Sequence, residues 1–145
     1  MVIARELSTL GTCDRKQVGA LIVRDGRCIS WGFNGAPPGL PHCAENFHGY
    51  HDAYSRVGLT AAEALEKHGC RNATHAEANA LAFAARQGIS TDGGTLYVTV
   101  SPCDVCARLL IAAGIVSVWY DEEYRDRRGL ELLEEAGIEC HIVAL

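Results

Sequence analysis

Two short segments of the chain carry residues that could bind a metal ion and move protons. His75 and Glu77 stand two positions apart, and Cys103 and Cys106 form a Cys-x-x-Cys pair further along the chain. One histidine and two cysteines offer three zinc ligands, and catalytic zinc sites keep the fourth position open for water, whereas structural sites close with four protein ligands. A carboxylate beside such a water can take up its proton. The pattern therefore predicts a hydrolytic zinc with Glu77 as the proton shuttle.

The same two segments also have the features of ordinary helix starts. Thr74 and Glu77 match a capping box, and Ser101-Pro102 matches an N-cap followed by proline at the first helical position. Either segment alone favours this structural interpretation. Together they put all four candidate residues on the first turns of two helices, where unpaired N–H groups and a partial positive charge favour thiolates. Capping and metal binding are compatible, and the Cys-x-x-Cys spacing indicates zinc.

The chain has seven cysteines, of which this site uses two. Cys28 and Cys140 lie in strand-like apolar runs, so we expect both to be small core residues. The other three lie near histidines, and one set of them would make a closed, structural zinc site: Cys13, Cys43, His48 and Cys70. The alternative is a group of ordinary thiols and surface histidines in a loop, and spacing alone does not decide between the two.

The composition is typical of a soluble globular domain, with 145 residues, 48% hydrophobic and 21% charged. No apolar run approaches the length of a membrane span, and Arg5 and Glu6 stand where a signal peptide would have its apolar core. An odd number of cysteines without such a signal favours the reducing cytoplasm. The net charge of −5 argues against general nucleic-acid affinity, and we expect the RDRR cluster at 125–128 to be a solvated helix start rather than a polyanion site.

The order of the predicted elements is typical of an α/β fold. Strands over Gln17–Val23 and Arg27–Phe33 are joined by Asp25-Gly26, a strong hairpin signal. From Thr74 onwards, helices that end at a glycine alternate with strands, over residues 75–87, 95–100, 103–113, 115–120, 127–136 and 138–143. Such alternation predicts parallel strands with crossover helices, and hence a three-layer α-β-α sandwich around a mixed five-stranded sheet.

The region between the hairpin and Thr74 is less regular. Leu59–His68 has helical spacing with Thr60 as a candidate N-cap. Residues 35–58 are rich in Gly, Pro, His and Asn, and loops of this length are usually functional or tied down. We therefore expect one domain over residues 1–145, with an insertion at about 35–70 that a metal ion holds together.

Both candidate sites lie within a longer pattern. H-x-E…P-C-x-x-C is the signature of zinc deaminases that act on nucleobases. Further segments match a C…VGA…GYNG run, a histidine–cysteine pair, an HAExNA helix, an LYVT-x-x-PCxxC stretch and a later aromatic segment, at Cys13, Gln17–Ala20, Gly32–Gly35, His42–Cys43, His75–Ala80, Leu96–Cys106 and Val118–Tyr124. With these segments the chain resembles the deoxycytidylate (dCMP) deaminase family of the cytidine-deaminase-like fold over nearly its whole length. The resemblance is weakest over Gly49–Glu66, and Phe33 replaces the usual tyrosine.

The resemblance implies zinc-dependent conversion of dCMP to dUMP and ammonia, which feeds thymidylate synthesis. It places His75, Cys103 and Cys106 on the catalytic zinc, with Glu77 as the proton shuttle. Some members carry a second zinc at positions that match Cys13, Cys43, His48 and Cys70. Because some relatives have Cys where His48 stands, His42 and His68 are alternatives for the fourth ligand.

The resemblance also implies substrate contacts and an assembly. The matching positions for substrate are Asn34, at the sugar or phosphate, and more weakly Asn79, Tyr120 and Tyr124. Many members are hexamers that dCTP activates and dTTP inhibits, so we expect a homo-oligomer with these nucleotides as effectors. Phe33 and the divergent segment Gly49–Glu66 fall where an effector pocket would lie.

Other proteins use the same zinc chemistry, and they remain alternatives. They include deaminases of tRNA adenosine, guanine, cytidine and dCTP. An enzyme acting on nucleic acid would need a basic groove, which this acidic chain does not indicate. A free-nucleoside enzyme needs no phosphate contacts. A zinc-stabilised module without catalysis would have no use for Glu77.

Overall fold

The computed structural model describes residues 1–50 and 58–143 of the chain. Five strands form one sheet: β1 (Gly19–Arg24), β2 (Arg27–Phe33), β3 (Thr95–Val100), β4 (Ser117–Glu122) and β5 (Glu139–Ile142). Their order is β2-β1-β3-β4-β5. Strand β1 runs antiparallel to both of its neighbours, whereas β3, β4 and β5 are parallel to one another. The predicted mixed five-stranded sheet is confirmed.

The hairpin between β1 and β2 turns at the predicted residues. Asp25 and Gly26 have φ values of 52° and 71°, the left-handed pair that a two-residue hairpin turn of this type requires. The hairpin leaves β2 at the edge of the sheet, and the Cys28 side chain is exposed there. The expectation that Cys28 is a core residue is therefore wrong, whereas Cys140 is half-buried against the core.

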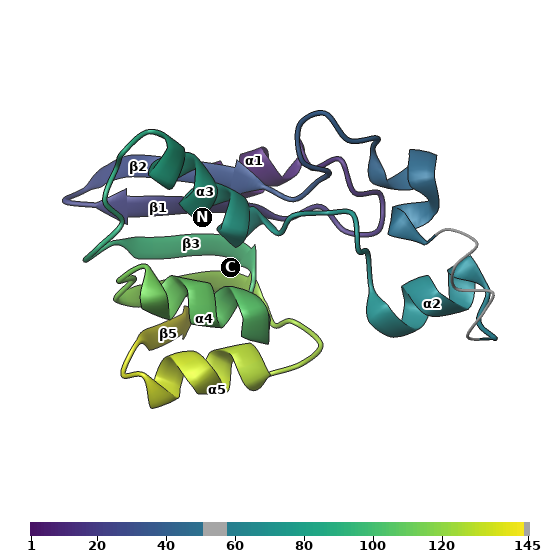
Figure 1. Cartoon of the computed structure of the whole chain (residues 1–145). Coiled ribbons are helices and arrows are strands. Elements are labelled where there is room, and N and C mark those ends of the chain that lie inside the picture. Colours follow the sequence, from purple (N-terminus) through teal and green to yellow (C-terminus); the bar gives the residue numbers. More distant parts are fainter. Residues whose placement is uncertain (51–57, 144–145) are drawn as a thin grey trace.

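Helices cover both faces of the sheet, as Figure 1 shows. The helices are α1 (Val2–Ser8), α2 (Ala61–His68), α3 (Ala76–Arg86), α4 (Asp104–Ala112) and α5 (Arg128–Glu135). Three of them, α3, α4 and α5, line one face, and α1 lies on the other against β1. The three-layer sandwich is thus confirmed, with a single short helix as its third layer. None of the helices in the described ranges is long and apolar enough to cross a membrane.

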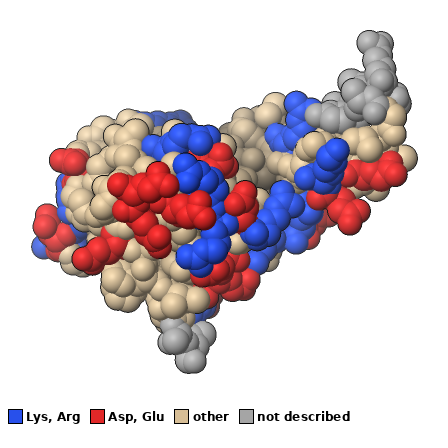
Figure 2. Space-filling view, turned by 90° about the horizontal axis from the view of Figure 1, so that it is seen from below, with Lys and Arg blue, Asp and Glu red and all other residues tan. Residues whose placement is uncertain are grey.

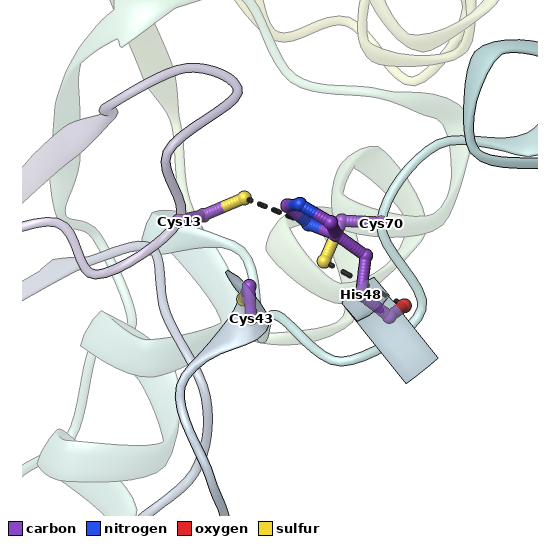
Figure 3. Close-up of side chains that lie close together, drawn as sticks. All are labelled: Cys13, Cys43, His48 and Cys70. Carbon is purple, nitrogen blue, oxygen red and sulfur yellow. Dashed lines mark hydrogen bonds between the residues drawn. The ribbon is translucent and has the colours of Figure 1, made fainter. Parts of the chain in front are cut away.

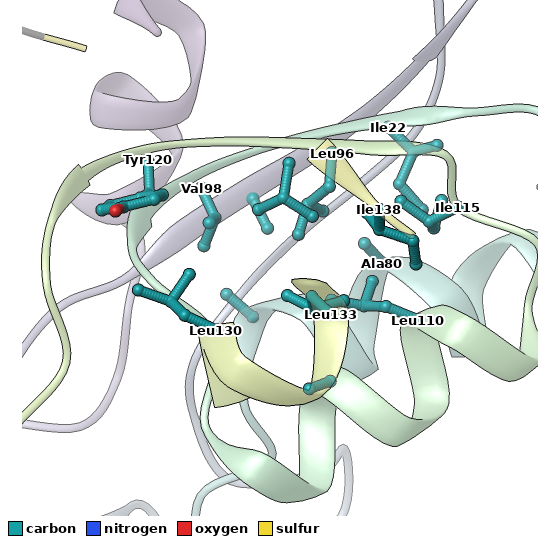
Figure 4. Packing of buried hydrophobic residues seen from close by; sticks show 14 residues of the cluster. Ile22, Ala80, Leu96, Val98, Leu110, Ile115, Tyr120, Leu130, Leu133 and Ile138 are labelled. Carbon is teal, nitrogen blue, oxygen red and sulfur yellow. The ribbon is translucent and has the colours of Figure 1, made fainter. Parts of the chain in front are cut away.

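The main core lies between the sheet and the layer of α3, α4 and α5 (Figure 4). Leu96 and Val98 of β3 alternate with residues that face the other way, and both are fully buried. Leu110 on α4 and Leu133 on α5 are fully buried on the helical side. Each buried leucine stabilises the fold by roughly 1.5–3 kcal/mol through removal of apolar surface from water. Ala76 in the first turn of α3 and Ala107 in the first turn of α4 belong to the same buried cluster, so this packing fixes where both helices begin.

The insertion after β2 forms a smaller lobe beside the sheet (Figure 1). It contains a 3-10 helix, η1 (Cys43–Gly49), which the sequence pattern did not predict, and the predicted helix α2. The Thr60 hydroxyl accepts a hydrogen bond from the Glu63 N–H at 3.2 Å, so the predicted N-cap is confirmed. Residues 51–57 of the predicted irregular insertion lie outside the described residues. Backbone hydrogen bonds between Gly35 and Thr74 close the base of the lobe.

Candidate active site

The first turns of α3 and α4 bring the predicted zinc ligands together. His75 is the N-cap of α3, and Cys103 is the N-cap of α4. The sequence pattern had assigned these capping roles to Thr74 and Ser101, and both assignments are wrong. The Thr74 backbone pairs with Gly35 instead. Because the Ser101 hydroxyl accepts the N–H of Tyr124 at 2.7 Å, it holds a loop rather than a helix end, and Pro102 precedes the cap.

The distances within the cluster fit a zinc ion. His75 Nδ1 lies 3.5 Å from the Sγ atoms of both Cys103 and Cys106. Tetrahedral coordination with ordinary Zn–S and Zn–N bond lengths puts nitrogen and sulfur about 3.6 Å apart. These three side chains form one of two groups in the described part of the chain whose donor atoms all lie within 4.8 Å of one another. Three ligands leave one position for water, which is the arrangement of a catalytic site.

The charges of the three ligands are adapted to a cation. A hydrogen bond from Cys106, with a further one from His75, lowers the pKa of the Cys103 thiol to about 4. The pKa of Cys106 is raised by the same hydrogen bond and by burial. The hydrogen bond with Cys103 raises the pKa of His75 to about 8. A divalent cation would replace these shared protons and hold both sulfurs as thiolates.

Glu77 lies beside this cluster and lines the same cavity. Its side chain is only 4% exposed, although carboxylates are rarely buried without a partner. Burial raises the pKa of Glu77 to about 7, which is near the value that suits a group that both accepts and donates a proton at neutral pH. No hydrophobic packing role requires a carboxylate at this position. The predicted shuttle and the three predicted ligands therefore meet in one site.

A cavity of about 550 Å³ opens over the cluster, a size that suits a small-molecule ligand. His75, Glu77 and Cys103 line it. Its rim carries three cations that the sequence pattern did not assign to the site: Arg15, Lys16 and Arg125. Figure 2 shows Lys and Arg side chains gathered between the larger body and the smaller lobe. Arg125 is exposed, as expected of a solvated cluster, and it also lines this cavity.

Two of these cations approach the same point. A Cβ atom built on Gly69 would lie 3.6 Å from Arg15 Nη1 and 3.9 Å from Arg125 Nη2. Among the described residues, neither guanidinium has a carboxylate within 4.0 Å, whereas Lys16 Nζ pairs with Glu122 at 2.6 Å. Two converging guanidinium groups without a carboxylate partner favour an anionic ligand, because planar N–H donors match phosphate oxygens.

The predicted substrate contacts divide into two pairs. Asn34 and Tyr124 line the cavity, whereas Asn79 and Tyr120 are not among its lining residues. The Asn79 amide donates to the Phe33 carbonyl at 2.7 Å and so ties α3 to β2. Tyr120 is 6% exposed and belongs to the core cluster.

Asn34 has a structural task in the cavity wall. Its Oδ1 accepts the N–H of Val18, and its Nδ2 donates to the carbonyl of Lys16, both at 2.7 Å. These two bonds fix the segment that carries Arg15 and Lys16. One N–H and one lone pair of the amide remain for a ligand.

The second predicted ligand set also comes together, in the smaller lobe. Figure 3 shows the side chains of Cys13, Cys43, His48 and Cys70 meeting from separate segments. Their donor atoms lie within 4.8 Å of one another, and three of the four residues are buried. The group contains His48 rather than His42 or His68. Burial raises the pKa of the Cys43 thiol to about 12 and also raises that of Cys13.

This donor set suits a structural metal. Three sulfurs and one imidazole are a common four-ligand zinc set, closed to water. A cation at the centre of the group would compensate the negative charge of the buried thiolates. His48 itself has a left-handed backbone, with φ of 57°, as does Phe47 with φ of 52°. Such conformations cost about 1–3 kcal/mol each in non-glycine residues, and surrounding contacts must compensate for them.

Comparison with known proteins agrees with this geometry. The family model of the cytidine and deoxycytidylate deaminase zinc-binding region matches residues 1–122. The chain belongs to this family. Deaminases of this family bind zinc, so the His75 cluster fits a property of the whole family.

Individual deaminases and their relatives extend the match. ComE operon protein 2 of Bacillus subtilis is 37% identical over 96% of this chain, which spans 66% of that protein. Deoxycytidylate deaminase of Enterobacteria phage T4 is 35% identical over 94% of this chain and 84% of its own length. The crystal structure of dCMP deaminase from cyanophage S-TIM5, in complex with dCMP and dUMP, has a TM-score of 0.79 and 31% identity, covering 98% of this chain and 92% of that one.

Proposed function

We propose that the chain catalyses the zinc-dependent hydrolytic deamination of dCMP to dUMP and ammonia, which supplies thymidylate synthesis. One observation carries this proposal: a three-ligand cluster beside the buried Glu77 opens into a cavity whose rim holds two converging guanidinium groups. The first part suits hydrolysis of an amidine-like carbon, and the second suits a substrate with a phosphate. The relatives that are named deoxycytidylate deaminases support the same substrate.

The residues of the site have separate tasks in this reaction. When held by His75, Cys103 and Cys106, zinc supplies an activated water at neutral pH. Glu77 would accept a proton from the attacking water and deliver it to the ring nitrogen of the pyrimidine, while the water oxygen adds to the carbon that carries the amine. Glu77 would then take the proton of the new hydroxyl group and deliver it to the amine as the C–N bond breaks and a C=O bond forms, so that one water is consumed and one ammonia leaves. Burial raises the pKa of this carboxyl group and a neighbouring cation would lower it, and the balance of the two would let it serve as base and then as acid.

The rim of the cavity would recognise the nucleotide. Arg15 and Arg125 would bind the 5′-phosphate, because both guanidinium groups lack a carboxylate partner among the described residues. Asn34 and Tyr124 line the same cavity and remain candidates for sugar or base contacts. This recognition would favour dCMP over deoxycytidine.

Another candidate is a deaminase of a different phosphorylated base or nucleotide. The diaminohydroxyphosphoribosylaminopyrimidine deaminase/5-amino-6-(5-phosphoribosylamino)uracil reductase of Thermotoga maritima has a TM-score of 0.66 and 28% identity, over 98% of this chain and 34% of its own chain. The name of that enzyme indicates that its substrate also carries a phosphoribosyl group. The higher similarity to the S-TIM5 dCMP deaminase favours dCMP.

We also propose a second, structural zinc on Cys13, Cys43, His48 and Cys70, which would hold the insertion at about 35–70 to the single domain. The meeting of three sulfurs and one imidazole from separate segments of the chain supports it. The use of cysteines as free thiols and metal ligands supports a reducing, cytoplasmic location.

Assembly and regulation are further parts of the proposal. An apolar groove between α3 and α4, lined by Leu81, Ala82 and Leu109 among others, supports a homo-oligomer, and a hexamer is expected. Regulation by dCTP and dTTP is expected because many members of the deoxycytidylate deaminase family respond to these two nucleotides. Light scattering of the purified protein with and without each nucleotide measures the assembly.

Turnover of a panel containing dCMP, deoxycytidine, dCTP, cytidine and guanine tests the proposed function, with zinc counted per chain. Product formation from dCMP with two zinc ions per chain supports it. Turnover of guanine or cytidine in preference to dCMP contradicts it.

A further inference from the structure

Residues 13–16 contribute side chains both to the second metal-ligand group and to the cavity over the first. Cys13 belongs to the second ligand group, and it also lines the cavity over the first. Arg15 and Lys16, which follow it closely, stand at the rim of that cavity. Cys70 has the same double position, since it is a member of the second group and a lining residue of the cavity. The second group therefore forms part of the cavity wall.

Asp14, within this segment, contacts the histidine of the second group. Asp14 Oδ1 lies 3.1 Å from His48 Nε2, on the side of the ring away from Cys13. The other ring nitrogen, Nδ1, faces Cys13 Sγ at 4.0 Å. A metal-binding histidine commonly donates its second N–H to a carboxylate, which fixes the tautomer and the direction of the ring. The two nitrogens of His48 thus have the partners that a zinc ligand needs.

The backbone around His48 is held from the opposite wall. The His48 carbonyl accepts the N–H of Arg71 at 3.0 Å. The Tyr50 hydroxyl donates to the Gly69 carbonyl at 2.7 Å, and Tyr50 is fully buried. Gly69 is the residue over which the Arg15 and Arg125 guanidinium groups converge. Hydrogen bonds therefore link the backbone of the second group to the part of the wall that lies nearest both guanidinium groups.

We propose that the second metal centre, with Asp14 as the residue that positions His48, determines specificity by holding Arg15 in place for the substrate phosphate. This inference rests on the proposed function, because it assumes that a nucleotide phosphate binds at Arg15 and Arg125. The centre lies outside the reacting atoms and acts through the cavity wall. Loss of the second metal raises the KM for a phosphorylated substrate more than it lowers kcat.

The test uses Asp14→Asn and Cys43→Ser, with Glu66→Gln as a control that removes one negative charge from an exposed position of the same lobe. Zinc per chain, the rate of zinc release to a chelator, and kcat and KM for dCMP and deoxycytidine are measured for each protein. We expect Cys43→Ser to retain one zinc and Asp14→Asn to release its second zinc at least about tenfold faster. In both, the ratio of kcat/KM for dCMP over deoxycytidine falls at least about tenfold, mainly through KM.

The outcomes separate this inference from the proposed function. Loss of the second zinc with an unchanged substrate ratio overturns the inference while the proposed function stands. An Asp14→Asn protein with wild-type zinc release and a wild-type ratio also overturns it, and this variant decides the matter if Cys43→Ser does not fold. Wild-type protein that fails to turn over dCMP contradicts the proposed function itself.

Discussion

His75 Nδ1 and Cys103 Sγ lie 3.5 Å apart although 28 positions separate them in the sequence. Each residue is the N-cap of a helix, so the meeting of two helix starts creates the ligand set. We expect Cys103→Ser to lose one zinc per chain and its deaminase activity, because hydroxyl oxygen is a poor substitute for a thiolate ligand. Metal analysis of the purified variant measures this. Cys28→Ser is the matched control, since Cys28 is exposed on the edge strand, and it should keep both metal and activity.

Replacement of Glu77 by Gln should reduce kcat roughly 10²–10⁴-fold, because the amide cannot carry the proton from water to the leaving amine. The zinc content should be unchanged, since Glu77 lies beside the ligand set and is not a member of it. Steady-state kinetics and metal analysis on the same preparation check both points. If the variant loses zinc, Glu77 is a ligand and its role has been misassigned.

The burial of Glu77 also predicts how the stability of the metal-free protein depends on pH. Its pKa is raised by burial to about 7 from an ordinary value of 4.5, so the folded state binds the proton more tightly than the unfolded state. The buried carboxyl group stabilises the fold fully when the pH is below 4.5, the pKa of Glu77 in the unfolded chain. This stability is lost as the pH rises through about 7, the pKa of Glu77 in the folded protein. The loss amounts to about 3 kcal/mol by pH 7–8.

Denaturant unfolding of chelator-treated protein between pH 5 and pH 8 measures this loss. Glu77→Gln removes the titrating group, so the variant should lose less stability than wild type over this range. Equal losses in the two proteins would show that Glu77 does not titrate there.

Arg15 should contribute to binding of the substrate phosphate. We expect Arg15→Ala to lower kcat/KM for dCMP by roughly tenfold or more, because a charge-assisted hydrogen bond contributes about 1.5–3 kcal/mol. Deoxycytidine lacks the phosphate, so its turnover should change much less. Arg27→Ala, at an exposed position in the hairpin, is the control. An equal loss for both substrates would mean that Arg15 supports the fold rather than the phosphate.

The sequence predicts most of the fold because its elements have strong local signals. Asp25-Gly26 marks the hairpin, and glycines mark the ends of the helices on the main face of the sheet. The helix starts are predicted only to within a residue or two. Thr74 and Ser101 both have good capping side chains, but the Thr74 backbone pairs with Gly35 and the Ser101 hydroxyl bonds to Tyr124. Cys28 was misassigned because an apolar run does not reveal that its strand lies at the sheet edge.

The residues of the candidate site were likewise predicted only in part. His75, Glu77, Cys103 and Cys106 are predicted because short spacing on a helix start fixes their relative positions. Arg15 and Arg125 could not be paired from the sequence, since their convergence over Gly69 depends on the path of the smaller lobe. The contact between Asp14 and His48 depends on a left-handed turn at two non-glycine residues, for which the sequence carries no local signal.

The most direct test of the account is the kcat/KM of the purified protein for dCMP compared with that for deoxycytidine, measured as formation of the uracil product and ammonia. We expect deamination of dCMP with a preference of at least about tenfold over deoxycytidine, because two guanidinium groups at the cavity would bind the phosphate. Equal turnover of the two substrates, or none of dCMP by zinc-loaded protein, would contradict it.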